Sequence, residues 1–356
     1  MTHKVLASQD LEEILKFAKS DFLQLKNKRI FITGGTGFIG KWLTQSLIKA
    51  QEQFQLNLHL TLLTRSTQNA LSLNPWLNQN YIHFLEGDTR SFAFPEKTFF
   101  DIIIHGAVAA SAKLNAESPE EMVRTCTEGT YHTLKWADHC GAKQFLLLSS
   151  GAVYGKQFTE ISHIEETSLT GPDILNPASA YHEGKRMSEL LGAIWAKQKG
   201  TEFKVARCFA FVGPYLPLDT HFAVGNFIAD GLKNKTIEIK GDGSSCRSLL
   251  YGTDLVIWLM RILIQGQSCR AYNVGSDENI NIKAMAQFVD KAAEEFFPQR
   301  QELKDRVVVY GKPNPNIPVE RYVPAISRIK EELNITMTVT LEDALRRTFQ
   351  WYINET

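Results

Sequence analysis

The sequence of 356 residues lacks features that would point to several classes of protein. Its 39 Lys and Arg are balanced by 39 Asp and Glu, so no basic excess indicates a nucleic-acid or membrane-surface partner. No stretch approaches the roughly 18 apolar residues of a membrane span, and acids interrupt the N-terminal segment where a signal peptide needs an apolar run. The five cysteines include no Cys-x-x-Cys pair, and no spacing of His, Cys, Asp or Glu indicates a metal site. We therefore expect a cytoplasmic protein that acts on small molecules.

What the chain does have is a regular alternation of short β-rich runs with segments of helical period. The β-rich runs are almost continuously apolar, which is typical of parallel strands covered on both faces by helices. The clearest helical segments span residues 119–139 and 180–198. The β-rich runs lie at residues 29–33, 58–64, 81–88, 100–107, 144–150 and 203–213.

The residue pattern of the sequence changes twice along the chain. Residues 10–25 have helical spacing and precede the first strand, so we expect residues 1–27 to form an N-terminal helical extension outside the main fold. After Val212 the strands become shorter and proline-rich loops separate them. The pattern predicts a larger α/β domain over residues 28–212 and a smaller lobe over 213–356; with the motifs described below, the first is expected to bind NAD(P) and the second, interleaved with it, mainly the substrate.

The turn after the first strand reads TGGTGFIG, with glycines at 34, 37 and 40. Gly34 allows a tight turn, Gly37 lets a pyrophosphate approach the backbone, and Gly40 lets the helix pack closely on the sheet. The helix N-terminus offers unpaired amides and a positive dipole end to the phosphates. This context predicts a Rossmann-type doubly wound sheet that binds NAD or NADP. The phosphate-side residues would include Thr36, Phe38 and Ile39.

The choice between NAD and NADP depends on the end of the second strand, where an acid would bind ribose and an arginine would favour a 2′-phosphate. Here Arg65 and Ser66 follow that strand, which slightly favours NADP, although Arg65 could equally stack on adenine in an NAD site. Asp88 is placed either to meet the adenine edge or to form a turn. Gly106 and Ala107 follow a buried strand and are small enough to let the cofactor approach closely.

A possible catalytic group stands at the start of the helix at residues 180–198. Tyr181 and Lys185 are four residues apart and therefore share a helix face. A lysine ammonium beside a tyrosine lowers the pKa of the phenol, so that it can exchange a proton with a hydroxyl or carbonyl group. Ser150 ends a buried strand, at the edge of the sheet where ligands of open α/β folds bind.

Together these motifs resemble the extended short-chain dehydrogenase/reductases, specifically the NAD-dependent epimerase/dehydratase family of nucleotide-sugar enzymes. The resemblance rests on TGGTGFIG, SSGAVYG, the Tyr181/Lys185 pair, ARCFAFVGP and GDGSSCRSLLYGTDL, which occur in the family order. It implies a tightly bound cofactor and hydride transfer at a sugar carbon, usually C4, through a keto intermediate. By the same resemblance Tyr181 is the acid/base, Lys185 also binds the nicotinamide ribose, and Ser150 binds the reacting oxygen.

Departures from the family pattern narrow the reaction. Family 4,6-dehydratases carry Asp-Glu after the catalytic hydroxyl residue, and nucleotide-glucuronate decarboxylases carry the Glu; this chain has Gly151 and Ala152. An epimerase or an NADPH-dependent 4-ketoreductase is therefore expected. A dehydratase that uses Lys113, Glu117 or His221 remains an alternative, as does a non-catalytic dinucleotide-sensing scaffold. Ala210 replaces a family Asn that contacts the phosphate side of the substrate.

The resemblance also implies how the nucleotide sugar is held. Arg247 and Arg321 match the family's pyrophosphate arginines, and Asn226 matches a residue that bonds the phosphates. Family members commonly dimerise through the two helices at residues 119–139 and 180–198. We therefore expect a homodimer that binds a nucleoside-diphosphate sugar.

Overall fold

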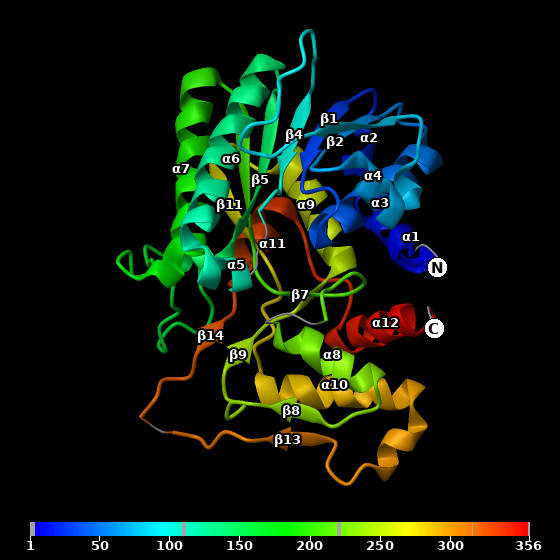
Figure 1. Ribbon diagram of the computed structural model, residues 1–356, viewed down its shortest axis with the longest axis vertical. Helices are drawn as coiled ribbons and strands as arrows, with labels where there is room; N and C mark the ends of the chain where they lie inside the picture. The colour runs from blue at the N-terminus through cyan, green and yellow to red at the C-terminus, as the bar shows by residue number, and fades with distance from the viewer. Residues whose placement is uncertain (1–3, 109–111, 219–221, 315, 355–356) are drawn as a thin grey trace.

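The computed structural model describes residues 4–108, 112–218, 222–314 and 316–354. Its centre is a seven-stranded, entirely parallel sheet with the order β11-β6-β5-β4-β1-β2-β3 (Figure 1). This confirms the predicted Rossmann-type α/β fold. Within the described ranges no helix is both long and apolar enough to cross a membrane. The strands of the sheet are β1 (Arg29–Thr33), β2 (His59–Thr64), β3 (Ile82–Glu86), β4 (Ile102–His105), β5 (Gln144–Ser150), β6 (Glu202–Cys208) and β11 (Arg270–Val274).

Both faces of the sheet are covered because side chains along each strand point alternately to opposite sides. Ile30 and Ile32 of β1 join one hydrophobic core, whereas Phe31 between them joins the other. The first core packs against α3 (Phe38–Phe54) and α9 (Gly252–Gln265), and the second against α6 (Pro119–His139) and α7 (Ala180–Lys199). Burial on both faces explains the continuous apolar runs in the sequence. Two shorter helices, α4 (Thr67–Leu73) and α5 (Ala112–Glu117), accompany this domain, with 3₁₀ turns at Pro75–Leu77, Gly151–Tyr154 and Pro177–Ser179.

A smaller lobe lies beyond the carboxyl ends of the strands, below the sheet in Figure 1. It contains α8 (Ala223–Leu232), α10 (Ile282–Phe296) and α12 (Leu341–Ile353). Short strands form three small sheets beside these helices, with the orders β13-β8, β12-β9-β14 and β10-β7. The remaining elements are β7 (Phe211–Val212), β8 (Ile237–Ile239), β9 (Cys246–Arg247), β10 (Leu250–Tyr251), β12 (Ile280–Asn281), β13 (Val307–Val309), β14 (Arg321–Tyr322), α11 (Ser327–Leu333) and the 3₁₀ turn Pro298–Glu302.

The sequence suggested that the N-terminal segment lies outside the main fold, but the structure shows that it packs onto it. It forms α1 (Ser8–Phe17) and α2 (Lys19–Leu23), which pack against α9, and both also contact α3. Ile14 and Phe22 are completely buried there, and the buried carboxylate of Asp10 pairs with Arg347 of α12 at 2.9 Å. Hydrophobic burial and this ion pair make the segment part of the same folded unit.

The later part of the chain returns to the main sheet. β11 pairs with β6 at the sheet edge, and α9 packs on β6, although both elements follow Val212 in the sequence. The two structural units are therefore interleaved along the chain.

Candidate active site

The first site element is the turn between β1 and α3. Gly34 has a φ of +76°, and a Cβ on Gly40 would lie 2.1 Å from the carbonyl oxygen of Gly34, so only glycine fits there. A Cβ on Gly37 would meet nothing nearer than 3.4 Å. The first helical hydrogen bond runs from Lys41 N to Gly37 O, which leaves the amides of residues 38–40 without a partner inside the helix. The turn therefore presents free donors on an open side, which fits a pyrophosphate.

Thr33 connects this turn to the end of β4. Its Oγ1 accepts hydrogen bonds from the amides of Gly106 and Ala107, each at 3.1 Å, and contacts His105 Nδ1 at 2.8 Å. Because both acceptor sites of the hydroxyl are filled, Thr33 donates to His105, and His105 Nε2 donates to Thr130 at 3.2 Å. Burial, helped by the charge of Lys185, lowers the pKa of His105 to about 3. A neutral imidazole thus fixes the two small residues where the sequence predicted close approach of a cofactor.

The adenosine side carries charges of both signs. Arg65 is exposed after β2, and the Ser66 hydroxyl caps α4 by accepting from Asn69 N at 3.2 Å. Both oxygens of Asp88 accept hydrogen bonds from Arg90, which are the main reason that the pKa of Asp88 lies below its usual range. Asp88 therefore forms the turn that was one of its two predicted roles.

An acid also stands on the neighbouring strand. Glu86 ends β3 directly opposite Thr64, and its carboxylate accepts a hydrogen bond from Thr67 N at 2.6 Å. The sequence shows no acid at the end of the second strand, but strand pairing brings Glu86 beside it. A cation and an acid thus share this corner of the sheet.

Ser150, Tyr181 and Lys185 come together at the carboxyl edge of the sheet. Ser150 ends β5 and accepts a hydrogen bond from Ala152 N at 3.1 Å, and Tyr181 stands in the first turn of α7, which packs against β5. Lys185 is buried and donates from Nζ to the carbonyl of Leu148 at 2.7 Å. Burial raises the pKa of Tyr181, and the neighbouring Ser150 hydroxyl offsets only part of this rise. The protein alone therefore keeps Tyr181 as a neutral phenol, in contrast to the lowering expected from Lys185.

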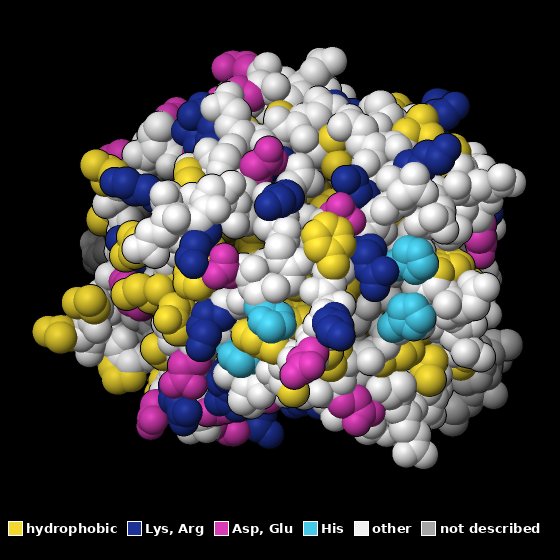
Figure 2. Space-filling model, turned by 90° about the horizontal axis from the view of Figure 1, so that it is seen from above, with side chains coloured by type: hydrophobic (Ala, Val, Ile, Leu, Met, Phe, Trp, Pro, Cys, Tyr) yellow, Lys and Arg dark blue, Asp and Glu magenta, His cyan; other side chains and the backbone are white. Residues whose placement is uncertain are grey.

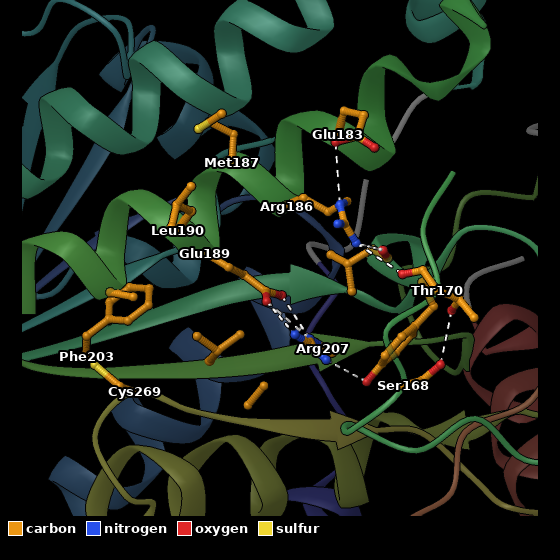
Figure 3. Close-up of a pocket in the computed structure, with 15 residues that line it drawn as sticks. Ser168, Thr170, Glu183, Arg186, Met187, Glu189, Leu190, Phe203, Arg207 and Cys269 are labelled. Atoms are coloured by element: carbon orange, nitrogen blue, oxygen red, sulfur yellow. Dashed lines mark hydrogen bonds and ion pairs between the residues drawn. The ribbon is translucent and has the colours of Figure 1, made fainter. Parts of the chain in front are cut away.

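A partly buried ion pair lies behind the end of β5. Glu189 of α7 accepts from Ser149 Oγ at 2.6 Å and pairs with Arg207 of β6 at 2.7 Å, as Figure 3 shows for the two charged residues. Both line a cavity of about 520 Å³ between α7 and residues 168–170. None of the three catalytic candidates lines this cavity. Its charged groups hold the residue before Ser150 in place.

The substrate-side residues lie on the small sheet β12-β9-β14. Arg247 of β9 is paired in register with Tyr322 of β14, whereas Arg321 is paired with Cys246. Since paired residues of adjacent strands point to the same face, Arg247 and Arg321 point to opposite faces. Arg321 donates to the carbonyl of Thr159, and Arg247 pairs with Glu320 at 3.1 Å. The structure therefore brings Arg247, but not Arg321, to the same face as Tyr322.

Tyr322 is a site residue that the sequence analysis missed. A Cβ on Gly151 would lie 2.7 Å from its phenol oxygen, and its ring lies 4.7 Å from that of Phe209. The signal was available in the motif ERYVPA, one position beyond Arg321. Without knowledge of the strand pairing, nothing showed which of the two neighbours faces the site.

The other candidates from the sequence are exposed or lie outside the described residues. Asn226 is exposed in the first turn of α8, and Lys113 and Glu117 are exposed on α5. His221 lies outside the described residues. In the part of the chain that the structure describes, no three His, Cys, Asp or Glu side chains are grouped as metal ligands.

Comparison with known proteins agrees with this geometry. Over residues 30–275 the sequence matches the NAD dependent epimerase/dehydratase family. The chain belongs to this family. UDP-glucuronic acid decarboxylase 6 of Arabidopsis thaliana is 31% identical over 330 residues, which cover 92% of this chain and 89% of that protein. The predicted family is confirmed, and the chain is an enzyme of the NAD-dependent epimerase/dehydratase family.

Solved structures share the fold of this epimerase/dehydratase. An epimerase of Methanothermobacter thermautotrophicus has a TM-score of 0.77 at 22% identity, with 96% of both chains covered. A dTDP-glucose 4,6-dehydratase of Bacillus anthracis, solved in complex with NAD, has a TM-score of 0.72 at 18% identity, with 92% of this chain and 97% of that chain covered. At these identities the likeness concerns the fold.

Proposed function

We propose that this enzyme is a nucleotide-sugar epimerase that oxidises and re-reduces one sugar carbon, C4, through a keto intermediate. The observation that carries the proposal is the meeting of Ser150 and Tyr181, with Lys185 on the same helix, at the edge of the sheet where the dinucleotide turn also lies. The family and its UDP-glucuronic acid decarboxylase relatives support a UDP-linked sugar as the substrate.

In this proposal Tyr181 and Lys185 serve both the cofactor and the substrate, and the other residues serve one of the two. A bound dinucleotide supplies the acceptor and donor for the hydride. Tyr181 takes the hydroxyl proton from the sugar and later returns it, Ser150 donates a hydrogen bond to the reacting oxygen, and the buried Lys185 ammonium favours the phenolate. Arg247 and Asn226 would hold the diphosphate, with Arg321 as a weaker candidate. The cofactor residues would be Gly34, Thr36, Gly37, Phe38, Ile39, Gly40, Arg65, Ser66, Asp88, Gly106, Ala107, Tyr181 and Lys185.

The surroundings of Ser150 support epimerisation over loss of water or carbon dioxide. A Cβ on Gly151 would lie 2.6 Å from Phe209 and 2.7 Å from the Tyr322 hydroxyl, so an acid cannot replace it without moving both rings. Ala152 is buried and has no proton to give. The two positions that carry acids in family dehydratases and decarboxylases are therefore inert here. We expect a product from UDP-glucuronic acid, if it reacts, that keeps its carboxyl group.

Identification of the retained cofactor and of the sugar products tests the proposal. The enzyme is purified without added ligand, and the dinucleotide released on denaturation is identified by mass spectrometry. The purified enzyme is then mixed with UDP-glucose, UDP-N-acetylglucosamine and UDP-glucuronic acid, and products are separated by chromatography. We expect retained NAD and a 4-epimer. If none of the nucleotide sugars reacts although the cofactor binds normally, the protein would instead be a non-catalytic dinucleotide-sensing scaffold.

Replacement of Tyr181 by Phe gives the first prediction. Turnover should fall by a factor on the order of 10²–10⁴, the size of a general acid–base contribution, because the phenol hydroxyl is lost. The dissociation constant of the dinucleotide, measured by fluorescence titration, should stay unchanged. Unaltered turnover would contradict the assignment of Tyr181.

A 4-ketoreductase is the second candidate, and Arg65 favours it. The exposed guanidinium after β2 is suited to the 2′-phosphate of NADPH, whereas Glu86 beside it is suited to ribose hydroxyls. A protein purified free of cofactor that binds NADPH far more tightly than NADH would replace the epimerase with the reductase. Arg65→Ala would then remove most of that preference.

We also propose a homodimer formed through α6 and α7. The two helices pack against each other and leave apolar side chains exposed, namely Tyr131, Met187, Leu190 and Ile194. Figure 2 shows apolar side chains along the left margin, the side on which α7 lies in Figure 1, while charges of both signs mix elsewhere on that face. A dimer mass in light scattering that becomes a monomer mass with Leu190→Arg would agree, and a monomeric wild type would not. The cytoplasmic location stays a prediction from the sequence.

A further inference from the structure

Asn115 of α5 holds the start of the helix that carries Tyr181. We propose that Asn115 is a positioning residue: it fixes the backbone at Tyr181 and thereby the place of the phenol hydroxyl that exchanges a proton with the sugar. The inference deepens the proposed function and rests on its assignment of Tyr181 as the acid/base. It gives a role to α5, a helix that the proposed chemistry does not otherwise use.

The side-chain amide of Asn115 bonds to the backbone on both sides of the start of α7. Its Oδ1 accepts a hydrogen bond from Tyr181 N at 3.0 Å, and its Nδ2 donates to the carbonyl of Ala178 at 2.9 Å. If the amide were turned over, two N–H groups would face each other, and so would two oxygens, so only this orientation satisfies both partners. The two bonds therefore hold the backbone on either side of Ala180, the first helical residue.

Asn115 replaces a cap that α7 does not supply itself. The first amides of a helix have no partner inside it, and the residue before the helix commonly accepts from one of them with its own side chain. Ser179 holds that place before α7, and its side chain makes no such bond. Asn176 caps only the preceding 3₁₀ turn, by accepting from Ala178 N at 3.0 Å. The capping bond at the Tyr181 amide thus comes from another helix.

The helix α5 turns Asn115, and not its charged residues, toward α7. Lys113 and Glu117 are four residues apart, share one helix face and are exposed. Asn115 stands midway between them in the sequence, so it lies on the opposite face, where it is half-buried. The helix is itself anchored, since it packs against α6 (Figure 1), and Leu114 joins the same small hydrophobic cluster as Tyr181. The amide therefore reaches α7 from a fixed support.

The place of the phenol hydroxyl depends on this backbone because the hydroxyl stands at the far end of a long side chain. A small tilt of the first turn of α7 is therefore enlarged at the oxygen, and a displacement of about 1 Å can cost on the order of 100-fold in rate. The hydrophobic cluster that Tyr181 joins also includes Val108, which directly follows the two small residues at which we expect the cofactor. Asn115 thus keeps Tyr181 in register with the cofactor side of the site.

Carbon NMR of the full-length protein, labelled at the tyrosine Cζ positions and with NAD present, tests the positioning without any substrate. The chain has ten tyrosines, and Tyr181→Phe assigns the resonance of Tyr181. Asn115→Ala should shift that resonance. Asn115→Asp keeps an acceptor for the Tyr181 amide and should return the resonance toward its wild-type position. A resonance that ignores Asn115→Ala, or that is displaced equally in both variants, would overturn the proposal.

Asn176→Ala is the matched control. It removes the same type of side chain and a bond of the same kind, from the turn directly before α7, but leaves both hydrogen bonds of Asn115 in place. The Tyr181 resonance should therefore stay at its wild-type position. An equal shift in Asn176→Ala would show that any loosening of this segment moves Tyr181, and it would remove the special role of Asn115.

Kinetics give a second, separate readout. With a sugar that the wild type epimerises, Asn115→Ala should lower kcat about tenfold and leave KM and the dissociation constant of the dinucleotide unchanged. In the Tyr181→Phe background the same change should have no further effect, because no hydroxyl remains to be positioned. A raised KM at unchanged kcat, or an equal loss in both backgrounds, would contradict the proposal. If no sugar reacts at all, the proposed function fails, while the NMR result still decides whether Asn115 positions Tyr181.

Discussion

The cofactor side and the substrate side of the active site are built in different ways. The turn that fits the pyrophosphate is a continuous stretch, residues 33–40, whose shape follows from its own glycines. The substrate side is assembled from β9 and β14, which are far apart in the sequence and meet only by strand pairing. The first region could therefore be interpreted residue by residue from the sequence. In the second, a difference of one residue decides which side chain faces the serine.

The strongest test of this contrast is a pair of glycine substitutions in the turn. Gly40→Ala places a Cβ 2.1 Å from Gly34 O, so we expect unfolding free energy to fall by about 3 kcal/mol or more, and cofactor binding to be lost. Gly37→Ala meets nothing within 3.4 Å, so it should keep wild-type stability and weaken cofactor binding at least about tenfold. Chemical denaturation and dinucleotide titration measure the two effects.

Equal cofactor affinity in Gly37→Ala and the wild type would show that the open side of the turn does not receive the phosphates. Normal stability in Gly40→Ala would show that the close approach of α3 to the turn tolerates a methyl group. Either result would remove the distinction between a glycine that shapes the turn and a glycine that leaves room for a ligand.

On the substrate side, replacing Arg247 and replacing Arg321 should have different effects. Arg247→Ala should raise KM for the nucleotide sugar about 10–100-fold at unchanged cofactor affinity, because a charge-assisted hydrogen bond to the diphosphate is lost. Arg321→Ala should leave KM near the wild-type value and lower the free energy of unfolding by about 1 kcal/mol, since its partner is the carbonyl of Thr159. Steady-state kinetics measures the effect on KM, and urea unfolding measures the effect on stability. A larger KM effect from Arg321 would restore the sequence-based assignment.

A smaller effect is expected from His105 on the cofactor side. Its pKa is about 3 in the folded protein and about 6.5 when unfolded, so the unfolded chain binds the proton more readily between these values. Stability is fully present above about pH 6.5 and falls, as pH drops toward 3, by up to about 1.4 kcal/mol per unit. His105→Gln should be less stable at neutral pH but should show a shallower acid slope in urea unfolding. Parallel slopes would contradict a buried neutral imidazole.

Much of the fold could be predicted because helices and parallel strands leave local patterns. The helix at residues 119–139 begins and ends as expected, and the helix predicted over 180–198 extends by one residue to Lys199. The helix of residues 1–27 was expected, but its attachment was not, since Asp10 finds Arg347 at the opposite end of the sequence. Contacts between elements that are far apart in the sequence leave no local pattern by which they could be predicted.

The same limit applies to the candidate site. Ser150, Tyr181 and Lys185 could be selected because each follows a local rule, a strand end or a helix spacing. Glu86 and Tyr322 could not be selected because their importance comes from the strand that lies next to theirs. The pKa of Tyr181 also depends on burial, which outweighs the opposing effect of Ser150.

The contact between the two ends of the chain has a practical consequence for protein engineering. Trp351 Nε1 donates to the carbonyl of Val5 at 2.8 Å, and the ends lie side by side in Figure 1. A fragment starting at residue 28 would expose the surface under Phe22 and leave Arg347 without Asp10, so it is not an independent folding unit. The neighbouring ends instead suit circular permutation, with a short linker joining them and new ends opened in an exposed loop.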